Sequence, residues 1–306
     1  MNLQPDDWLL AGLDGGHPLA FLAALGTLRI ATLVWPDSIP ALRWIKANGA
    51  WRPVLAVAGV TDREALLAGL HEQLKKMEGH PALAVGDNLN FTHAEFRNFA
   101  VAAQEQTEID PIRVAFLGAF ACEAVSEEKG ELLADTAFRT MRGAGHQHFV
   151  KTMRELVTST TVDNLEASMF KPWCYAENGL SLRLDPEDDR RYALRWKEPS
   201  GDPSRTERGA NRLAIEALPL FSVQPVGRRL QTTGFVTRPR LGTFLTWPIW
   251  ESMLPLDVIR SLLALSSLQQ DKPSRPELAA RGIVEIYRCQ RISLGKFRNF
   301  TSATPA

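Results

Sequence analysis

Apolar and polar positions alternate near the N-terminus in a pattern that predicts strand, helix, strand and strand. Residues 8–13 form a short apolar run that ends in a glycine turn, and residues 18–34 are apolar nearly all round, which predicts a buried helix. Two β-rich runs, 42–47 and 51–57, flank Asn48-Gly49. This pair favours a tight hairpin because both residues tolerate positive φ. The order begins a ferredoxin-like (RRM-like) α+β unit.

Helical periodicity follows as far as residue 170. The predicted helices cover residues 61–79, 92–106, 110–125, 145–158 and 162–170. Their charges fall on faces that a helix would expose, and their alanines and phenylalanines recur at helical spacing. We therefore expect a helical insertion in the N-terminal half.

Strand-like runs return in the second half of the chain. They cover residues 180–184, 192–196, 222–226, 230–236, 243–250 and 283–294. Helices are predicted at 212–221, with Asn211 as the N-cap, and at 256–268. This outline resembles that of the first unit. The sequence thus predicts an α+β protein of two ferredoxin-like/RRM-like units, with domains at residues 1–178 and 179–306.

The neutral total charge of the chain conceals two oppositely charged halves. Residues 1–187 carry 16 Lys and Arg against 24 Asp and Glu, whereas residues 188–306 carry 19 against 11. Of these 19 cations 16 are arginine, whose planar fork matches phosphate oxygens. Such an asymmetry indicates a polyanionic partner for the basic half.

The candidate nucleic-acid-binding residues are the cations of this half that fall in turns, loops and strands. They are Arg190, Arg191, Arg195, Arg205, Arg208, Arg228, Arg229, Arg238, Arg240, Arg288, Arg291, Lys296 and Arg298. The alternative for any single arginine is a pair with a nearby carboxylate on a solvated surface. A net charge of +8 over the half favours a phosphate chain for the set as a whole.

Catalytic motifs are not visible in the sequence. It contains no GxSxG, Walker or GxGxxG spacing and no evident Cys/His dyad, so we predict no enzyme and no cofactor. The acids from Asp185 to Asp189 could hold Mg²⁺ in a nuclease, but a turn is the favoured interpretation. His146-Gln147-His148 lacks further metal ligands at suitable spacing, and we predict no metal site.

Compartment is indicated by composition. Three widely separated cysteines favour a reducing cytoplasm, and the first residues carry no basic segment of a secretory signal. Arg29 and Gly26 interrupt the apolar run at 18–34, which favours a buried helix over a membrane span. We expect a cytoplasmic protein with no membrane partner.

Two stretches carry a family resemblance. GLDGGHPLAFLAALGTLRIA at 12–31, together with LDPEDDRRYALRWKEPS and GANRLAIEALPLF within 184–221, resembles CRISPR-associated proteins of the type I-G (formerly I-U) group, in its large-subunit (Cas8-like) or accessory families. The stretches cover about a fifth of the chain. The resemblance implies a component of an RNA-guided complex that binds target DNA and is not itself the nuclease.

Charge and resemblance together predict a non-catalytic subunit of a type I CRISPR interference (antiviral defence) complex. Its expected partners are crRNA, target DNA and other Cas subunits. Two alternatives stay open at this point. One is a metal-dependent nuclease that uses the acids at 185–189. The other is a purely structural subunit that binds proteins through the helix at 18–34 or through the predicted helical insertion.

Overall fold

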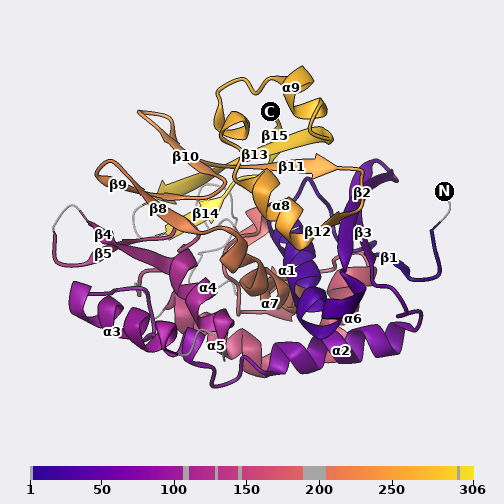
Figure 1. Ribbon diagram of the computed structural model, residues 1–306, viewed down its shortest axis with the longest axis horizontal. Helices are drawn as coiled ribbons and strands as arrows, with labels where there is room; N and C mark the ends of the chain where they lie inside the picture. Colours follow the sequence, from indigo (N-terminus) through magenta and orange to yellow (C-terminus); the bar gives the residue numbers. More distant parts are fainter. Residues whose placement is uncertain (1–2, 106–109, 128–129, 144–146, 189–204, 295–296) are drawn as a thin grey trace.

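Helices and small antiparallel sheets make up the fold (Figure 1), and the α+β prediction is confirmed. The computed structural model describes residues 3–105, 110–127, 130–143, 147–188, 205–294 and 297–306. Every strand pair within these residues is antiparallel. No helix in the described part combines the length and the apolar character that a bilayer crossing needs.

The first sheet contains strands from both halves of the sequence. Its order is β1 (Asp7–Leu9), β3 (Ala50–Ala56), β2 (Ala41–Ala47) and β12 (Leu254–Pro255). The predicted hairpin joins β2 and β3, with φ of 51° at Asn48 and 79° at Gly49. The fourth strand pairs Leu254 with Leu42, so the edge of this sheet is supplied by the C-terminal half.

The second sheet lies at the top of Figure 1 and is built from the C-terminal half. Its order is β10 (Phe235–Arg238), β11 (Gly242–Trp250), β13 (Ile283–Leu294) and β14 (Phe297–Phe300), with β15 (Thr304–Pro305) also on β13. Helices α8 (Leu256–Leu263) and α9 (Arg275–Ala279) connect β11 to β13. Three two-stranded sheets complete the strands within the described residues: β4 (Ala121–Ser126) with β5 (Leu133–Asp135), β6 (Glu177–Asn178) with β7 (Arg205–Thr206), and β8 (Val223–Val226) with β9 (Arg229–Thr232).

Helices α1 (Pro18–Val34) and α7 (Arg208–Ala217) cross at the centre of the molecule. Around and below them lie α2 (Arg63–Lys75), α3 (His93–Gln104), α4 (Pro111–Phe120), α5 (Phe149–Ser159) and α6 (Val162–Phe170). A Cβ atom added to Gly26 would lie 1.8 Å from the carbonyl oxygen of Leu213, so this close crossing requires glycine. One hydrophobic core extends from α1 through α7 to β11 and β13. The predicted division between residues 178 and 179 stays a prediction.

Buried ions fasten α1 to α7. Arg29 Nη1 lies 2.6 Å from Glu216 Oε2, and Arg212 Nη1 lies 2.8 Å from Glu216 Oε1. Arg212 Nη2 also donates to the carbonyl of Leu74 at 2.8 Å. The Glu216 carboxylate therefore binds two cations in a place that excludes water.

Several predicted elements differ from the observed ones. The predicted helix at 110–125 ends at Phe120, and residues 121–126 form β4. The predicted strand at 230–236 is divided by a turn at Gly234, which has φ of 79°. Asn211 lies inside α7, whose N-cap is Glu207. The prediction at 192–196 lies outside the described residues.

The sequence predicts a strand at residues 180–184, but the structure describes no strand there. Side chains, rather than a neighbouring strand, form the backbone hydrogen bonds of Leu182. Asn211 Oδ1 accepts from the N–H of Leu182, and Thr140 Oγ1 donates to the Leu182 carbonyl at 2.7 Å. Leu180 and Arg183 have φ of 40° and 56°, which no regular strand contains. The alternating apolar residues of this segment, Leu182 and Leu184, instead lie in the core.

Candidate active site

A glycine turn between β1 and α1 positions the first functional side chain, His17. Asp14 Oδ1 accepts from the N–H of Gly16 at 2.8 Å, which closes the turn. A Cβ at Gly15 would lie 2.8 to 2.9 Å from Ile249 and Trp44, so only glycine fits between these side chains. The chain thereby places His17 at the N-cap of α1, at the base of the C-terminal sheet.

His17 is held by contacts from two directions. Its Nε2 lies 3.2 Å from Asp185 Oδ1, and the N–H of Ala20 donates to its Nδ1 at 3.4 Å. Because Nδ1 accepts, the ring proton belongs on Nε2 and is donated to the carboxylate. The edge of the Trp173 ring meets the imidazole at 5.1 Å between centroids, which limits its rotation.

Asp185 is buried immediately before the 3₁₀ turn η4 (Pro186–Asp188). Its Oδ1 also accepts from the N–H of Glu187 at 2.9 Å. Its Oδ2 is buried without a hydrogen-bond partner among the described residues. The Tyr175 hydroxyl interacts with this carboxylate, which reduces the free-energy cost of its burial.

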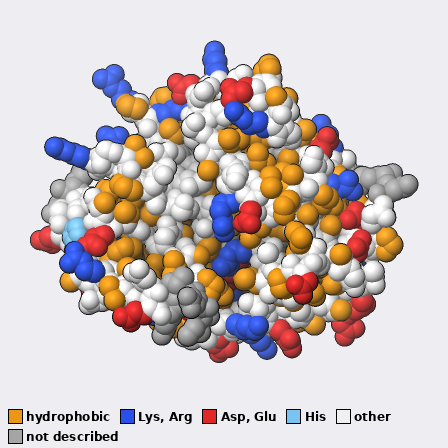
Figure 2. Space-filling model, viewed as in Figure 1, with side chains coloured by type: hydrophobic (Ala, Val, Ile, Leu, Met, Phe, Trp, Pro, Cys, Tyr) orange, Lys and Arg blue, Asp and Glu red, His pale blue; other side chains and the backbone are white. Residues whose placement is uncertain are grey.

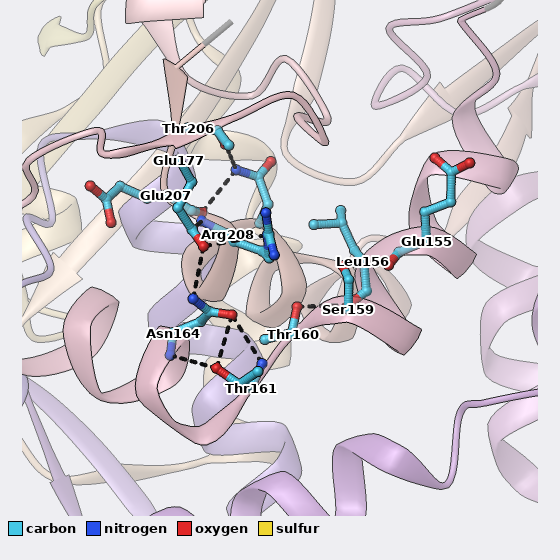
Figure 3. Close-up of polar contacts among 11 residues, drawn as sticks. Glu155, Leu156, Ser159, Thr160, Thr161, Asn164, Glu177, Thr206, Glu207 and Arg208 are labelled. Atoms are coloured by element: carbon cyan, nitrogen blue, oxygen red, sulfur yellow. Dashed lines mark hydrogen bonds and ion pairs between the residues drawn. The ribbon is translucent and has the colours of Figure 1, made fainter.

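Polar contacts between α6 and α7 hold the neighbouring segment that carries Tyr175 (Figure 3). Asn164 Nδ2 donates to Glu177 Oε1 at 2.8 Å, and the N–H of Arg208 donates to Glu177 Oε2 at 3.0 Å. Glu207 Oε1 accepts from the N–H of Tyr175 at 2.7 Å. These contacts stabilise Tyr175 in its left-handed conformation, with φ of 52°.

A cavity of about 330 Å³ opens beside His17, within the size range of small-molecule sites. Its lining includes Asp14 and His17 from the glycine turn, Tyr175 and Glu187 from the segment before α7, and Tyr287 from β13. Three regions that are distant in sequence thus meet at one opening. The cavity combines two carboxylates, an imidazole and two phenols.

Both tyrosines of the cavity remain protonated at neutral pH. Burial raises the pKa of the Tyr175 hydroxyl above its ordinary value, and the charge of Asp185 acts in the same direction. Burial also raises the pKa of Tyr287, and the charges of Glu285 and Asp14 add to the effect. The Tyr175 hydroxyl interacts with the Asp185 carboxylate, whereas the Tyr287 hydroxyl can donate a hydrogen bond to a ligand oxygen.

Burial also affects Glu207, the carboxylate that holds Tyr175. Desolvation raises the pKa of Glu207, and the bonds from the N–H groups of Tyr175 and Cys174 oppose this effect. The charges of Glu177 and Asp185 raise it further. The carboxylates of Asp185, Glu187 and Glu207 thus concentrate negative charge around Tyr175.

Several predicted nucleic-acid-binding arginines contact their own chain. Arg208 Nε lies 3.5 Å from Glu177 Oε1, and Arg238 Nε lies 2.7 Å from Asp271 Oδ1. Arg288 donates to Thr246 Oγ1 and to the carbonyls of residues 268, 270 and 271. Arg291 Nη2 donates to the carbonyl of Arg139 at 2.9 Å. The contacts of Arg238 and Arg288 join the C-terminal sheet to residues 268–271, and that of Arg291 joins it to the segment after β5.

Other predicted arginines lie exposed at the surface. Arg205, Arg228, Arg229 and Arg240 are exposed, and no ion pair joins them to another described residue. Figure 2 shows Lys and Arg side chains along the upper left edge of this face, over the turns next to β9 and β10. Arg190, Arg191, Arg195 and Lys296 lie outside the described residues. Binding of crRNA or target DNA by the set, and of other Cas subunits by the chain, stays a prediction.

The acidic run does not form a metal centre within the part that the structure describes, where no group of three or more potential ligands occurs. Asp185 faces His17, whereas the buried Asp188 accepts from Asn299 Nδ2 through its carbonyl. Asp189 and His146 lie outside the described residues. His148 Nδ1 lies 2.8 Å from Asn88 Nδ2.

Comparison with known proteins gives one partial similarity. The chain is 38% identical over 101 residues to a trans-aconitate 2-methyltransferase of Streptomyces avermitilis, and the match covers 30% of this chain. It spans about a third, 35%, of the length of that curated relative. No family model matches the chain, and no solved structure matches it.

This similarity contradicts the prediction of a non-catalytic CRISPR interference subunit, and with it the prediction that the chain is not an enzyme, because the relative is an enzyme. The physical reason for the error lies in the position of the polar groups that meet at the cavity. His17 and Asp185 are 168 residues apart and form no local motif. A glycine turn ahead of an apolar helix, with a histidine at the N-cap, was the available signal. The resemblance to the type I-G group stays a prediction, and the match shows similarity to part of a methyltransferase.

Proposed function

We propose that the chain is an enzyme that performs acid–base chemistry on a small molecule bound in the cavity beside His17. The contact between His17 and Asp185 carries the proposal, because it places a carboxylate behind an imidazole at a cavity of ligand size. The partial similarity to an enzyme supports it. The pairing of a base with an orienting carboxylate recurs in unrelated enzymes.

Each side chain has a role in this chemistry. Asp185 holds the Nε2 proton of His17 and stabilises the imidazolium that forms when Nδ1 accepts a proton from the substrate. The bond from Ala20 N–H to Nδ1 is long at 3.4 Å, so a substrate proton can replace it. Tyr287 donates a hydrogen bond to an oxygen that gains negative charge, and the Tyr175 hydroxyl helps to hold Asp185.

The charge of the cavity limits the substrate. Asp14 and Glu187 line it, and Asp185 lies behind His17, so an anion would meet three carboxylates. We therefore propose a neutral or cationic substrate. A tricarboxylate such as trans-aconitate, which is in the relative's name, does not suit this cavity.

Methyl transfer is a second candidate, favoured by the partial match alone. A methyl donor of the sulfonium class is a cation, and the carboxylates and phenol rings of the cavity suit such a charge. The described strands are all antiparallel, however, whereas the open α/β crevice that binds nucleotide-like cofactors forms at parallel strands. No reaction step is assigned to a methyl donor for this reason.

Substitutions at the pair test the proposal. Wild type, His17→Gln and Asp185→Asn would be incubated with a panel of small amines, amides, esters and nucleosides, with turnover followed by mass spectrometry. We expect each substitution to reduce turnover by about 10²- to 10⁴-fold. His93→Gln, at an exposed histidine, is the matched control and should retain turnover.

Two results would contradict acid–base catalysis at this site. One is turnover that both substitutions leave unchanged while circular dichroism shows an intact fold. The other is transfer of a labelled methyl group from S-adenosylmethionine at equal rates in wild type and His17→Gln, which would establish the second candidate instead.

A further inference from the structure

Four arginines gather around two carboxylates where the end of the β13–β14 hairpin meets the segment after β5. Arg139 and Arg142 come from that segment, Arg291 from β13 and Arg298 from β14. We call Arg139, Arg142, Arg291 and Arg298 the guanidinium cluster. Its carboxylates are Asp135 and Glu127, which leave an excess of two positive charges among the described residues.

The cations of this cluster are unequally compensated. Arg139 pairs with Asp135 and donates to Asn90 Oδ1, so its donors are occupied. Arg142 lies 2.8 Å from Glu127 and 3.6 Å from Asp135. The two arginines of the hairpin have no carboxylate within ion-pair distance in the described part of the chain. The excess charge therefore belongs to Arg291 and Arg298.

The hairpin register places these two arginines on one face. Ser293 pairs with Arg298, and Arg291 is two residues before Ser293 on β13, so Arg291 and Arg298 are diagonal neighbours. Arg291 Nη2 donates to a backbone carbonyl, whereas its Nε is buried without a partner among the described residues. A buried N–H donor thus lies beside a second guanidinium without an acceptor among the described residues.

Burial makes this arrangement costly in the absence of an anion. Desolvation lowers the pKa of Arg291 to about 9, and the charges of Arg298, Arg142 and Arg139 add to the effect. Desolvation also lowers the pKa of Arg298. Guanidinium groups nevertheless stay protonated in proteins, so the like-charge repulsion persists in the folded state.

We propose that the guanidinium cluster is a binding site for a phosphate monoester dianion. Arg291 and Arg298 contact the phosphate oxygens, and the exposed Arg142 lies at the entrance of the site. The two charges of a monoester equal the excess of the cluster, whereas each phosphate of a polynucleotide strand carries one. The planar forks of arginine suit phosphate oxygens. The site is separate from the His17 cavity, since Arg291 is four residues beyond Tyr287 on β13, about 13 Å along an extended strand.

Titration with inorganic phosphate and with a nucleoside monophosphate, at constant ionic strength set by chloride, tests the site. We expect both to raise the melting temperature of the full chain and to bind by calorimetry. Arg298→Gln should weaken that binding about tenfold or more. Arg228→Gln, at an exposed arginine of the β8–β9 turn, is the matched control and should bind as wild type does.

Stability without phosphate separates binding from a structural role. In chloride alone, Arg298→Gln should melt at the temperature of wild type or higher, because repulsion is relieved. A lower melting temperature, absence of a phosphate effect in wild type, or undiminished binding by Arg298→Gln overturns the proposal. So does a single-stranded oligonucleotide without terminal phosphates that binds as tightly as the monoester and depends on Arg298 in the same way.

Discussion

The contact between α1 and α7 buries Arg29 and Arg212, and the guanidinium cluster half-buries Arg291 and Arg298, but the arginines of the two regions are paired differently. At the helix contact, one carboxylate, Glu216, binds Arg29 and Arg212, and a backbone carbonyl accepts a further bond from Arg212. At the cluster, Arg291 and Arg298 lack such a carboxylate among the described residues. At the helix contact each buried arginine therefore has an ion-pair partner, which indicates a structural role, whereas Arg291 and Arg298 have none among the described residues, which indicates a position for a ligand.

The largest effect is expected where the compensated charge is broken. Glu216→Gln leaves Arg29 and Arg212 buried without a counter-ion, and we expect a loss of about 3–5 kcal/mol in the free energy of unfolding. Urea unfolding followed by circular dichroism measures it. A loss below about 1 kcal/mol would show that the helix contact does not depend on this compensation.

A somewhat smaller effect tests the close crossing that buries these ions. Gly26→Ala places a Cβ against the carbonyl of Leu213, and we expect a loss of about 1–3 kcal/mol or more. Gly118→Ala is the matched control on the exposed side of α4, where an added Cβ meets nothing within 4 Å. That variant should gain a few tenths to about 1 kcal/mol, since alanine favours helix. Equal effects of the two substitutions would contradict the close crossing.

The carboxylates around Tyr175 are a third group of partly buried charges. They predict that the stability of the fold depends on pH. The pKa of Glu207 is higher in the folded than in the unfolded state, so the folded state holds a proton that the unfolded state releases. The free energy of unfolding therefore falls as pH rises from the ordinary carboxyl pKa through the folded pKa. Glu207→Gln keeps an oxygen for the N–H groups of Cys174 and Tyr175 and removes the titration. We expect a flatter stability profile for the variant in urea unfolding from pH 4 to 7. An unchanged slope would assign the pH dependence to other groups.

The smallest effect is expected at the uncompensated charge. Arg298→Gln should change the free energy of unfolding in chloride by less than about 0.5 kcal/mol, or raise it slightly. The same urea series used for Glu216→Gln provides the measurement. A loss as large as that of Glu216→Gln would remove the distinction between the two regions.

Local sequence patterns determined much of the secondary structure. The helix at 18–34, the helix at 162–170 and the strand at 283–294 have the predicted bounds, and the Asn48-Gly49 hairpin has the expected positive φ angles. These features depend on periodicity and on backbone preferences of adjacent residues, which any single sequence displays. The predicted strand at 180–184 is wrong because distant side chains satisfy its backbone.

Only the tertiary structure decided where reactive and charged groups meet. It brings His17 to Asp185 across 168 residues. It also separates the predicted arginines into those that bind backbone carbonyls of the same chain, those that lie exposed, and those that cluster without a counter-ion among the described residues. Charge counted along a chain is an average over positions, whereas binding depends on distances and burial in three dimensions. The sequence by itself therefore determined the elements and the charge of each half, and folding decided which charges the protein compensates and which remain available to a ligand.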